Sequence, residues 1–175
     1  SNNENSPPKI SIILNVPEQD EISFSTLNSI LKQKYSHFEI MLTGAISNES
    51  ISQVTRYFSD VPSEIMVNGG RTLQSGIENS TGKFIAFCEN GDCWSEDHLS
   101  KKVAIISSYQ NPVVVVNDIK LVGDRQYFKY LQEIIDIRNS FINGKTMRIS
   151  DDLWRKNDFI LNASCCMVRK DVLHK

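Results

Sequence analysis

Short apolar runs rich in β-branched residues alternate with amphipathic segments along this chain, and this pattern limits the possible folds most strongly. The first run, residues 10–14, reads Ile-Ser-Ile-Ile-Leu, which is typical of a strand covered on both faces. Phe24, Leu27 and Leu31 follow at positions i, i+3 and i+7, so we expect a helix over about residues 22–33. Repetition of this unit predicts an α/β fold, a mostly parallel sheet with helices on both faces.

The same pattern predicts the remaining elements. Further strands are expected at 38–42, 63–67, 83–87, 112–116 and 163–168. Further helices are expected around Ile51, Val54 and Phe58 with Ser47 or Asn48 as the cap, over 70–79, after the cap Ser95, over 125–141, and from Lys170. Ligands of such sheets bind beyond the carboxyl ends of the strands, so the segments after Leu14, Leu42 and Phe87 form the expected binding region.

Charge and hydropathy exclude several classes of protein. The 19 Lys and Arg residues against 21 Asp and Glu residues give a net charge of −2, unlike the strongly basic domains that bind nucleic acids. Apolar runs such as Val113–Val116 are far shorter than the ~20 residues of a transmembrane helix. Residues 1–8 show no signal peptide, and we expect a linker or cloning remnant there, before a single domain over 9–175.

The four cysteines suggest no disulfide framework and no zinc site. Cys88, Cys93, Cys165 and Cys166 lack the spacing that either would need. We expect reduced thiols packed as small hydrophobic side chains. This favours a cytoplasmic protein, either free or peripheral to the membrane.

Common nucleotide and hydrolase motifs do not occur in the sequence. There is no P-loop and no G-x-G-x-x-G after the first strand, which argues against P-loop chemistry and against nicotinamide or flavin cofactors. There is no G-x-S-x-G elbow of a serine hydrolase. The three histidines, His37, His98 and His174, are expected to have surface roles.

The acidic loop Glu89-Asn90-Gly91-Asp92 follows a predicted buried strand and leaves two interpretations open. Glu89 and Asp92 would project at the carboxyl edge of the sheet, where two carboxylates could hold Mg²⁺ or Mn²⁺. Alternatively, the loop is an acidic turn before the helix that Ser95 is expected to cap.

Three collinear parts of the sequence resemble a known enzyme family. They are residues 9–14 with 26–40, residues 75–87 with 92–95, and residues 164–173. Together they resemble the family-2 glycosyltransferases of the GT-A fold, a Rossmann-like fold, from about Lys9 to the end of the chain. The resemblance implies transfer of a sugar from a nucleotide-sugar, usually a UDP- or TDP-sugar, to a glycan or lipid-linked acceptor in bacterial polysaccharide synthesis.

The functional motifs of that family differ in this chain at four places. The family's Pro-Val-Tyr-Asn loop reads Asn15-Val16-Pro17-Glu18, its base-binding acidic pair falls on Gly44-Ala45, its Arg-Asn falls on Leu73-Gln74, and its metal-binding Asp-x-Asp falls on Glu89-Asn90-Gly91. The family's catalytic base is expected beyond Lys175, so the catalytic residue is unknown and the GT-A fold is expected to lack its C-terminal part.

The resemblance nevertheless implies roles for several residues. Those implied to bind the nucleotide are Val16, Pro17, Glu18, Arg71 and Asn90, and those implied to share a Mg²⁺ or Mn²⁺ ion are Glu89 and Asp92. Loss of a metal ligand would weaken the stabilisation of the leaving group. Two hypotheses follow: a glycosyltransferase with divergent donor recognition, or a degenerate GT-A domain that serves assembly, acceptor binding or regulation among the other domains of a larger protein.

Overall fold

The computed structural model describes residues 6–18, 20–44, 46–60, 72–109, 114–117, 120 and 163–173. The strand predicted at 63–67 and the helix predicted at 125–141 lie outside these residues. No helix within the described ranges has the length and apolar character needed to cross a membrane.

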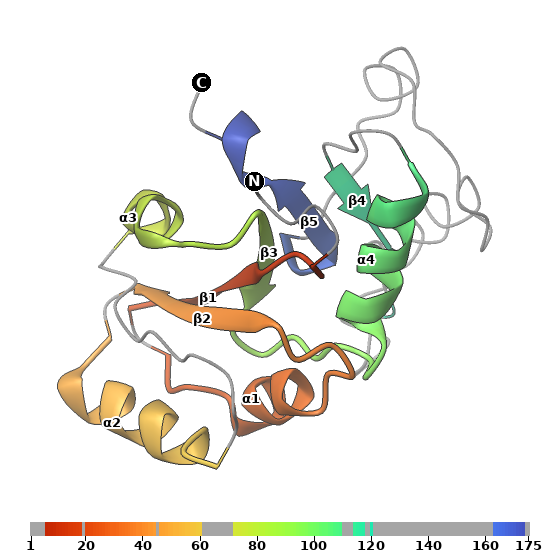
Figure 1. Cartoon of the computed structure of the whole chain (residues 1–175). Helices are drawn as coiled ribbons and strands as arrows, with labels where there is room; N and C mark the ends of the chain where they lie inside the picture. Colours follow the sequence, from red (N-terminus) through yellow and green to blue (C-terminus); the bar gives the residue numbers. More distant parts are fainter. Residues whose placement is uncertain are drawn as a thin grey trace.

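In the described part of the chain, five strands form one mixed sheet in the order β2-β1-β3-β5-β4 (Figure 1). The central strand β1 (Ile10–Val16) lies between β2 (Phe38–Gly44) and β3 (Phe84–Glu89) and is parallel to both. β5 (Cys166–Arg169) is antiparallel to β3 and to β4 (Val114–Val116). The predicted mostly parallel sheet is confirmed, and β5 is the strand of opposite direction.

Side-chain caps begin three of the described helices. α1 (Phe24–Leu31) follows Ser23, whose hydroxyl accepts a hydrogen bond from the N–H of Thr26. α2 (Asn48–Tyr57) follows Ser47, one of the two predicted caps, and α3 (Leu73–Asn79) follows Thr72 in a capping box. These hydroxyls satisfy N–H groups that have no partner within the first helical turn.

α4 (His98–Ser108) begins later than predicted because Ser95 is not its N-cap. The Ser95 hydroxyl lies 2.9 Å from Oδ1 of Asp97, and the Ser95 carbonyl accepts from the N–H of His98 at 3.0 Å. Asp97 takes the N-cap position without a capping hydrogen bond from its side chain. The Ser95 hydroxyl, which we expected to cap the first turn of the helix, therefore forms its hydrogen bond within the turn that precedes the helix.

The last described elements also differ from prediction. A short 3-10 helix, η1 (Ala163–Cys165), occupies the start of the predicted strand, so that β5 begins at Cys166. A second 3-10 helix, η2 (Lys170–Val172), replaces the predicted α-helix start at Lys170.

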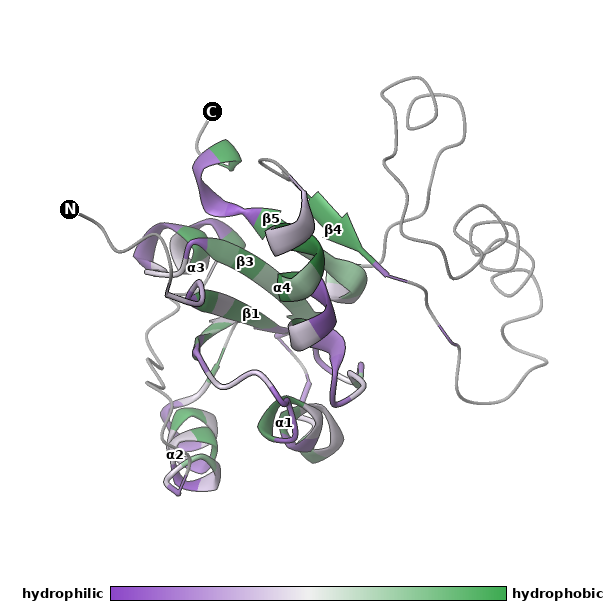
Figure 2. Cartoon of the chain, turned by 45° about the vertical axis from the view of Figure 1, so that its right-hand side comes forward, coloured by the Kyte–Doolittle hydropathy of each residue, from purple (hydrophilic) through white to green (hydrophobic). Residues whose placement is uncertain are grey.

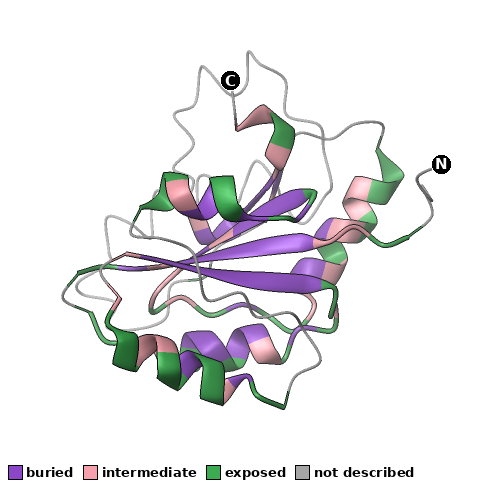
Figure 3. Cartoon of the chain, turned by 60° about the vertical axis from the view of Figure 1, so that its left-hand side comes forward, coloured by how far each residue is buried: buried purple, intermediate pink, exposed green. Residues whose placement is uncertain are grey.

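Helices cover both faces of the sheet, as predicted: α1 and α2 lie on one side and α3 lies on the other (Figure 1). The main core combines Ile10, Ile12 and Leu14 of β1 with Leu27 and Ile30 of α1, Val54 of α2, Phe58 after it, and Leu99 of α4. Ile13, Met41 and Ile85 form a smaller cluster on the opposite face. The central strands are largely hydrophobic (Figure 2) and buried (Figure 3), which agrees with their nearly continuous apolar sequence.

A buried carboxylate, Glu39 of β2, joins the amino ends of the strands. Its Oε1 accepts hydrogen bonds from the Ser11 hydroxyl at 2.5 Å and the Thr81 N–H at 2.6 Å, and Nζ of Lys9 lies 3.1 Å from Oε2. Burial alone would raise the pKa of Glu39, but the hydrogen bonds from Ser11, Thr81 and Lys9 outweigh it and lower the pKa to about 2. Glu39 is therefore ionised and fixes the sheet edge opposite the predicted binding region.

Candidate functional site

The carboxyl ends of β1, β2 and β3 meet at one edge of the sheet and carry three polar side chains. Asn15 of β1 is in register with Thr43 of β2 and with Glu89 of β3. Nδ2 of Asn15 donates to Oε2 of Glu89 at 3.0 Å, and Oδ1 of Asn15 accepts from the Thr43 hydroxyl at 3.3 Å. The segments predicted to form the binding region therefore come together, although each strand extends two residues further than predicted. This is the edge at which open α/β sheets bind ligands.

The loop after β1 contains three of the predicted nucleotide-binding residues. Val16 is 3% exposed and packs in the main core, and its contact with a nucleotide stays a prediction. Pro17 and Glu18 are exposed and follow directly at the carboxyl edge. A fourth predicted residue, Arg71, lies outside the described residues.

Asn90, also predicted to bind the nucleotide, links the acidic loop to the loop after β1 through two hydrogen bonds. Its Oδ1 accepts from the N–H of Ser23 at 2.8 Å, and its Nδ2 donates to the carbonyl of Glu21 at 2.8 Å. The N–H of Gly91 donates to the Thr26 hydroxyl of α1 at 2.9 Å. Both polar ends of the Asn90 side chain are used within the protein, and its contact with a nucleotide stays a prediction.

The other side of the acidic loop is bound to Ser164 in η1. The Ser164 hydroxyl accepts from the N–H of Glu89 at 2.8 Å and donates to Oδ2 of Asp92 at 2.6 Å. The indole N–H of Trp94 donates to the Ser164 carbonyl at 2.9 Å. Sequence reasoning did not single out this hydroxyl, because Glu89 and Asp92 lie 75 and 72 residues before it. The position of Asn15 at the end of a predicted strand was a signal that could have identified that residue.

Glu89 and Asp92 are the carboxylates predicted to hold Mg²⁺ or Mn²⁺. Glu89 uses Oε2 for Asn15, while its Oε1 has no hydrogen-bond partner among the described residues. Within the described ranges, no three or more His, Cys, Asp and Glu side chains form a group that could hold a metal ion. Mg²⁺ is usually bound by one or two carboxylates together with substrate phosphates. Two carboxylates match the type of ligand that such a cation takes, and its binding by Glu89 and Asp92 stays a prediction.

His98 and Lys102 of α4 are buried beside this loop, so the predicted surface role was wrong for His98. His98 is 7% exposed and stacks on Trp94 with 4.3 Å between ring centroids, and its Nε2 has no hydrogen-bond partner in the described structure. Burial and then the charge of Lys102 lower the pKa of His98 to about 3, against a smaller opposite effect of Asp97. The imidazole is therefore neutral and contributes to packing.

The other histidines and the cysteines mostly follow the predictions. His37 is exposed, as predicted, and His174 lies outside the described residues. Cys88, Cys165 and Cys166 are buried free thiols, and burial raises the pKa of Cys88. Cys93 is also a free thiol but is exposed, so the prediction of packing was wrong for this residue.

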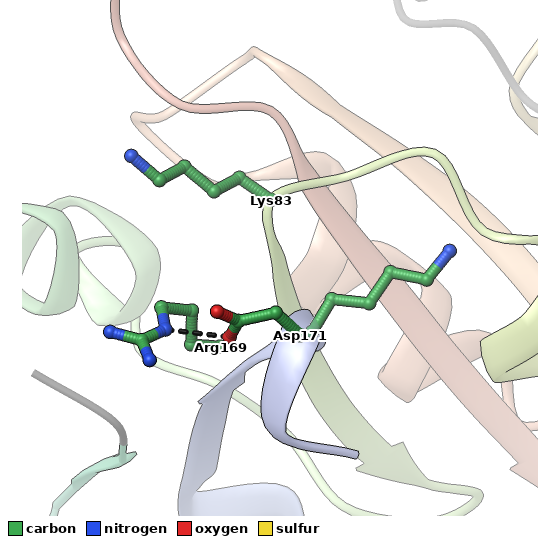
Figure 4. Close-up of a pocket in the computed structure, with 4 residues that line it drawn as sticks. Lys83, Arg169 and Asp171 are labelled. Carbon is green, nitrogen blue, oxygen red and sulfur yellow. Dashed lines mark hydrogen bonds and ion pairs between the residues drawn. The ribbon is translucent and has the colours of Figure 1, made fainter. Parts of the chain in front are cut away.

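A hollow of about 330 Å³ lies at the opposite, amino edge of the sheet, lined by Lys83, Arg169, Lys170 and Asp171 (Figure 4). Nε of Arg169 lies 2.6 Å from Oδ1 of Asp171, and the Lys170 ammonium donates to the carbonyl of Ser80. Two of its three cations thus have partners within the protein. The carboxylates of the acidic loop, Glu89 and Asp92, lie instead at the carboxyl edge.

Comparisons with known proteins show which family and which relatives this chain resembles. The family model described as Glycosyl transferase family 2 matches residues 25–175. The amylovoran biosynthesis glycosyltransferase AmsB of Erwinia amylovora is 23% identical over 179 residues, which cover 92% of this chain and 56% of that protein. The UDP-Glc:alpha-D-GlcNAc-diphosphoundecaprenol beta-1,3-glucosyltransferase WfgD of Escherichia coli is 23% identical over 124 residues, which cover 65% of this chain and 49% of that protein. The chain thus spans about half the length of these relatives.

Solved structures share the fold at low sequence identity. S. aureus TarS 1–349 in complex with UDP has a TM-score of 0.61 at 14% identity, covering 95% of this chain and 48% of that one. The mannosyltransferase PcManGT from Pyrobaculum calidifontis, in complex with GDP-Man and Mn²⁺, has a TM-score of 0.60 at 12% identity, covering 97% of this chain and 47% of that one. These likenesses establish the GT-A fold, as predicted.

Proposed function

Because the chain belongs to glycosyl transferase family 2, we propose that it binds the nucleoside diphosphate part of a nucleotide-sugar at the carboxyl edge of β1, β2 and β3. The chain would then be the donor-binding part of an enzyme that transfers a sugar during polysaccharide synthesis. Fold and family alone do not establish activity, so the proposal depends on the site.

The observation that carries the proposal is the hydrogen-bonded row Thr43–Asn15–Glu89. It lies where three parallel strands end, and the two loops that leave this edge are joined through Asn90. A prearranged polar edge of this kind can hold a ligand without a large ordering cost on binding.

Each part of the edge has a proposed role. Pro17 and Glu18 would contact the base, with Arg71 near a phosphate, and Asn90 would hold the loop that carries these contacts. Glu89 and Asp92 would bind Mg²⁺ or Mn²⁺ together with the diphosphate. A divalent cation there would offset the negative charge that develops on the leaving diphosphate.

The acceptor and the surroundings of the domain are also proposals. We infer a glycan or lipid-linked acceptor, because the name of WfgD specifies a diphosphoundecaprenol substrate. A lipid-linked acceptor would require the protein to work at a membrane surface. No nucleic acid partner is proposed, since the net charge of −2 does not suit a polyanion.

Calorimetric titration of the chain with UDP, GDP, UDP-glucose and GDP-mannose, with and without Mn²⁺, tests the proposal. We expect saturable binding of at least one nucleotide, and we expect Mn²⁺ to tighten it. Glu89→Gln should remove much of the Mn²⁺-dependent part. Glu78→Gln is the matched control, because Glu78 is an exposed residue of α3 that bonds only to Gln74 among the described side chains.

A chain that melts cooperatively but binds none of these ligands would contradict the proposal, because a ligand that binds the native state must also stabilise it. That outcome would favour the degenerate GT-A domain.

A further inference from the structure

We propose that Ser164 is a positioning residue for the acidic loop, which it orients for binding a divalent cation together with a nucleoside diphosphate. It would act through the side chain of Asp92 and the backbone of Glu89. The inference rests on the proposed function and adds a residue from a part of the chain distant in sequence.

The hydroxyl of Ser164 both accepts and donates a hydrogen bond. It accepts from the N–H of Glu89 at 2.8 Å and donates to Oδ2 of Asp92 at 2.6 Å, in a residue that is 7% exposed. A serine hydroxyl has a single O–H to donate, and here that proton is directed at a carboxylate in a short, charge-assisted hydrogen bond. The Asp92 carboxylate is therefore held in one orientation relative to the backbone of Glu89.

Ser164 is itself fixed by neighbouring elements. Its carbonyl accepts from the indole of Trp94 at 2.9 Å. The next carbonyl, of Cys165, accepts from the Lys102 ammonium at 2.5 Å and from the N–H of Asn117 at 3.2 Å. β5 follows directly and pairs with β3, the strand that carries Glu89. The hydroxyl thus belongs to a rigid support, as the geometry of a binding site requires.

The consequence for ligand binding follows from the chemistry of metal ligands. Groups that hydrogen-bond to a ligating carboxylate orient it, and their removal typically lowers metal affinity roughly 10–100-fold. Glu89 is supported by Asn15 at its side chain and by Ser164 at its N–H. Because Ser164 also holds Asp92, a single hydroxyl links both proposed metal ligands.

Ser80 provides a matched control for a merely structural role. It is 4% exposed, and its hydroxyl donates at 2.6 Å to the carbonyl of Ile77, within the same turn of the chain. Ser80→Ala therefore removes an equally buried hydroxyl without touching the acidic loop.

Electron paramagnetic resonance of Mn²⁺, titrated with the chain in the presence and absence of UDP or GDP, whichever binds in calorimetry, measures the effect without an assay of activity. We expect Ser164→Ala to weaken Mn²⁺ binding in the presence of that nucleotide by roughly tenfold or more. Ser164→Thr, which keeps the hydroxyl, should recover most of this affinity, and Ser80→Ala should bind as the wild type does. In an Asp92→Asn background the effect of Ser164→Ala should become much smaller, since interacting residues are not additive.

The outcomes separate this inference from the proposed function. A wild-type chain that binds none of UDP, GDP, UDP-glucose and GDP-mannose overturns the proposed function, and this inference with it. A wild-type chain that binds a nucleotide and Mn²⁺ overturns the positioning role alone if Ser164→Ala keeps the wild-type affinity or if Ser80→Ala loses as much. If Ser164→Ala shows no cooperative melting transition, Ser164→Cys replaces it, because the thiol is similar in shape but a weak donor. The same loss is expected for that variant, and wild-type affinity would overturn the inference.

Discussion

Gly44 at the end of β2 approaches the backbone of Val16 so closely that a Cβ atom on Gly44 would lie 1.8 Å from the Val16 carbonyl oxygen. Gly44 also has a φ of +109°, in a region that residues with a side chain rarely adopt. The acidic pair of the family falls on Gly44-Ala45 in the sequence. The pairing of β1 with β2 therefore excludes an acidic side chain at the first of these two positions.

This contact predicts a large loss of stability for Gly44→Ala. The new methyl group would force the ends of the two strands apart and would also strain the backbone, which together should cost about 3 kcal/mol or more. Urea denaturation followed by circular dichroism measures the free energy of unfolding. A loss below about 1 kcal/mol would be inconsistent with the close approach to Val16, since backbone strain alone should reach that value.

Gly91 in the acidic loop differs from Gly44, because a Cβ there would meet no atom within 4 Å although φ is +100°. Gly91→Asp, which restores the second carboxylate of the family motif, should therefore cost only backbone strain, about 1–2 kcal/mol. The added carboxylate should tighten Mn²⁺ binding in the presence of UDP. Unfolding measurements and Mn²⁺ resonance titrations check the two effects.

Gly91→Asn is the control for this variant, because it introduces the same backbone strain without the charge. Equal Mn²⁺ affinity in Gly91→Asp and Gly91→Asn would show that position 91 does not face the bound cation.

The fold was largely predictable because apolar periodicity is a local signal. The run at 10–14 and the spacing of Leu27 and Leu31 were sufficient for β1 and α1, although the predicted helix start at Ile22 lies before the N-cap Ser23. The antiparallel direction of β5 could not be read in this way. Direction depends on how the chain returns to the sheet, and no pattern within Cys166–Arg169 encodes that.

The location of the site could be predicted from the sequence, whereas most of the contacts within it could not. Strand ends located the carboxyl edge, and Glu89 and Asp92 lie there as predicted. The hydrogen bonds of Ser164 link positions more than 70 residues apart, so they depend on tertiary structure. The burial of His98 and Lys102, one helical turn apart, was missed because polar residues on a surface helix normally face solvent.

Glu39 should make the protein sensitive to strong acid. The carboxyl of a glutamate in the unfolded chain has a pKa of 4.5, whereas the pKa of Glu39 in the folded protein is about 2. Below pH 4.5 the unfolded state binds more protons, so the stability from Glu39 is complete above this pH and is lost as the pH falls towards 2. Glu39→Gln should flatten this dependence. It should also cost about 3 kcal/mol at pH 7, because Lys9 loses its buried partner.

Urea denaturation between pH 7 and pH 2.5 measures this effect, with Glu96→Gln as the control because Glu96 is exposed. Parallel pH profiles for the wild type and Glu39→Gln would disprove the role of this carboxylate.

His98 should control stability in a milder pH range. In the unfolded chain an imidazole is protonated below its ordinary pKa of 6.5, whereas folded His98 stays neutral down to about pH 3. The unfolded state therefore binds more protons below pH 6.5, and the free energy of unfolding should fall as the pH decreases towards 3. Between pH 6.5 and 4.5 this loss precedes that of Glu39, so the two contributions can be separated.

His98→Phe tests this expectation, because phenylalanine can keep the stacking on Trp94 and has no unpaired Nε2. At pH 7 the free energy of unfolding should stay within about 1 kcal/mol of the wild type, since an apolar group of similar shape replaces an unsatisfied polar one. Between pH 6.5 and 4.5 the variant should lose less stability than the wild type. His37→Gln, which changes an exposed imidazole, should keep the wild-type profile. If His98→Phe and the wild type lose stability equally over this interval, the buried imidazole is not the group that titrates.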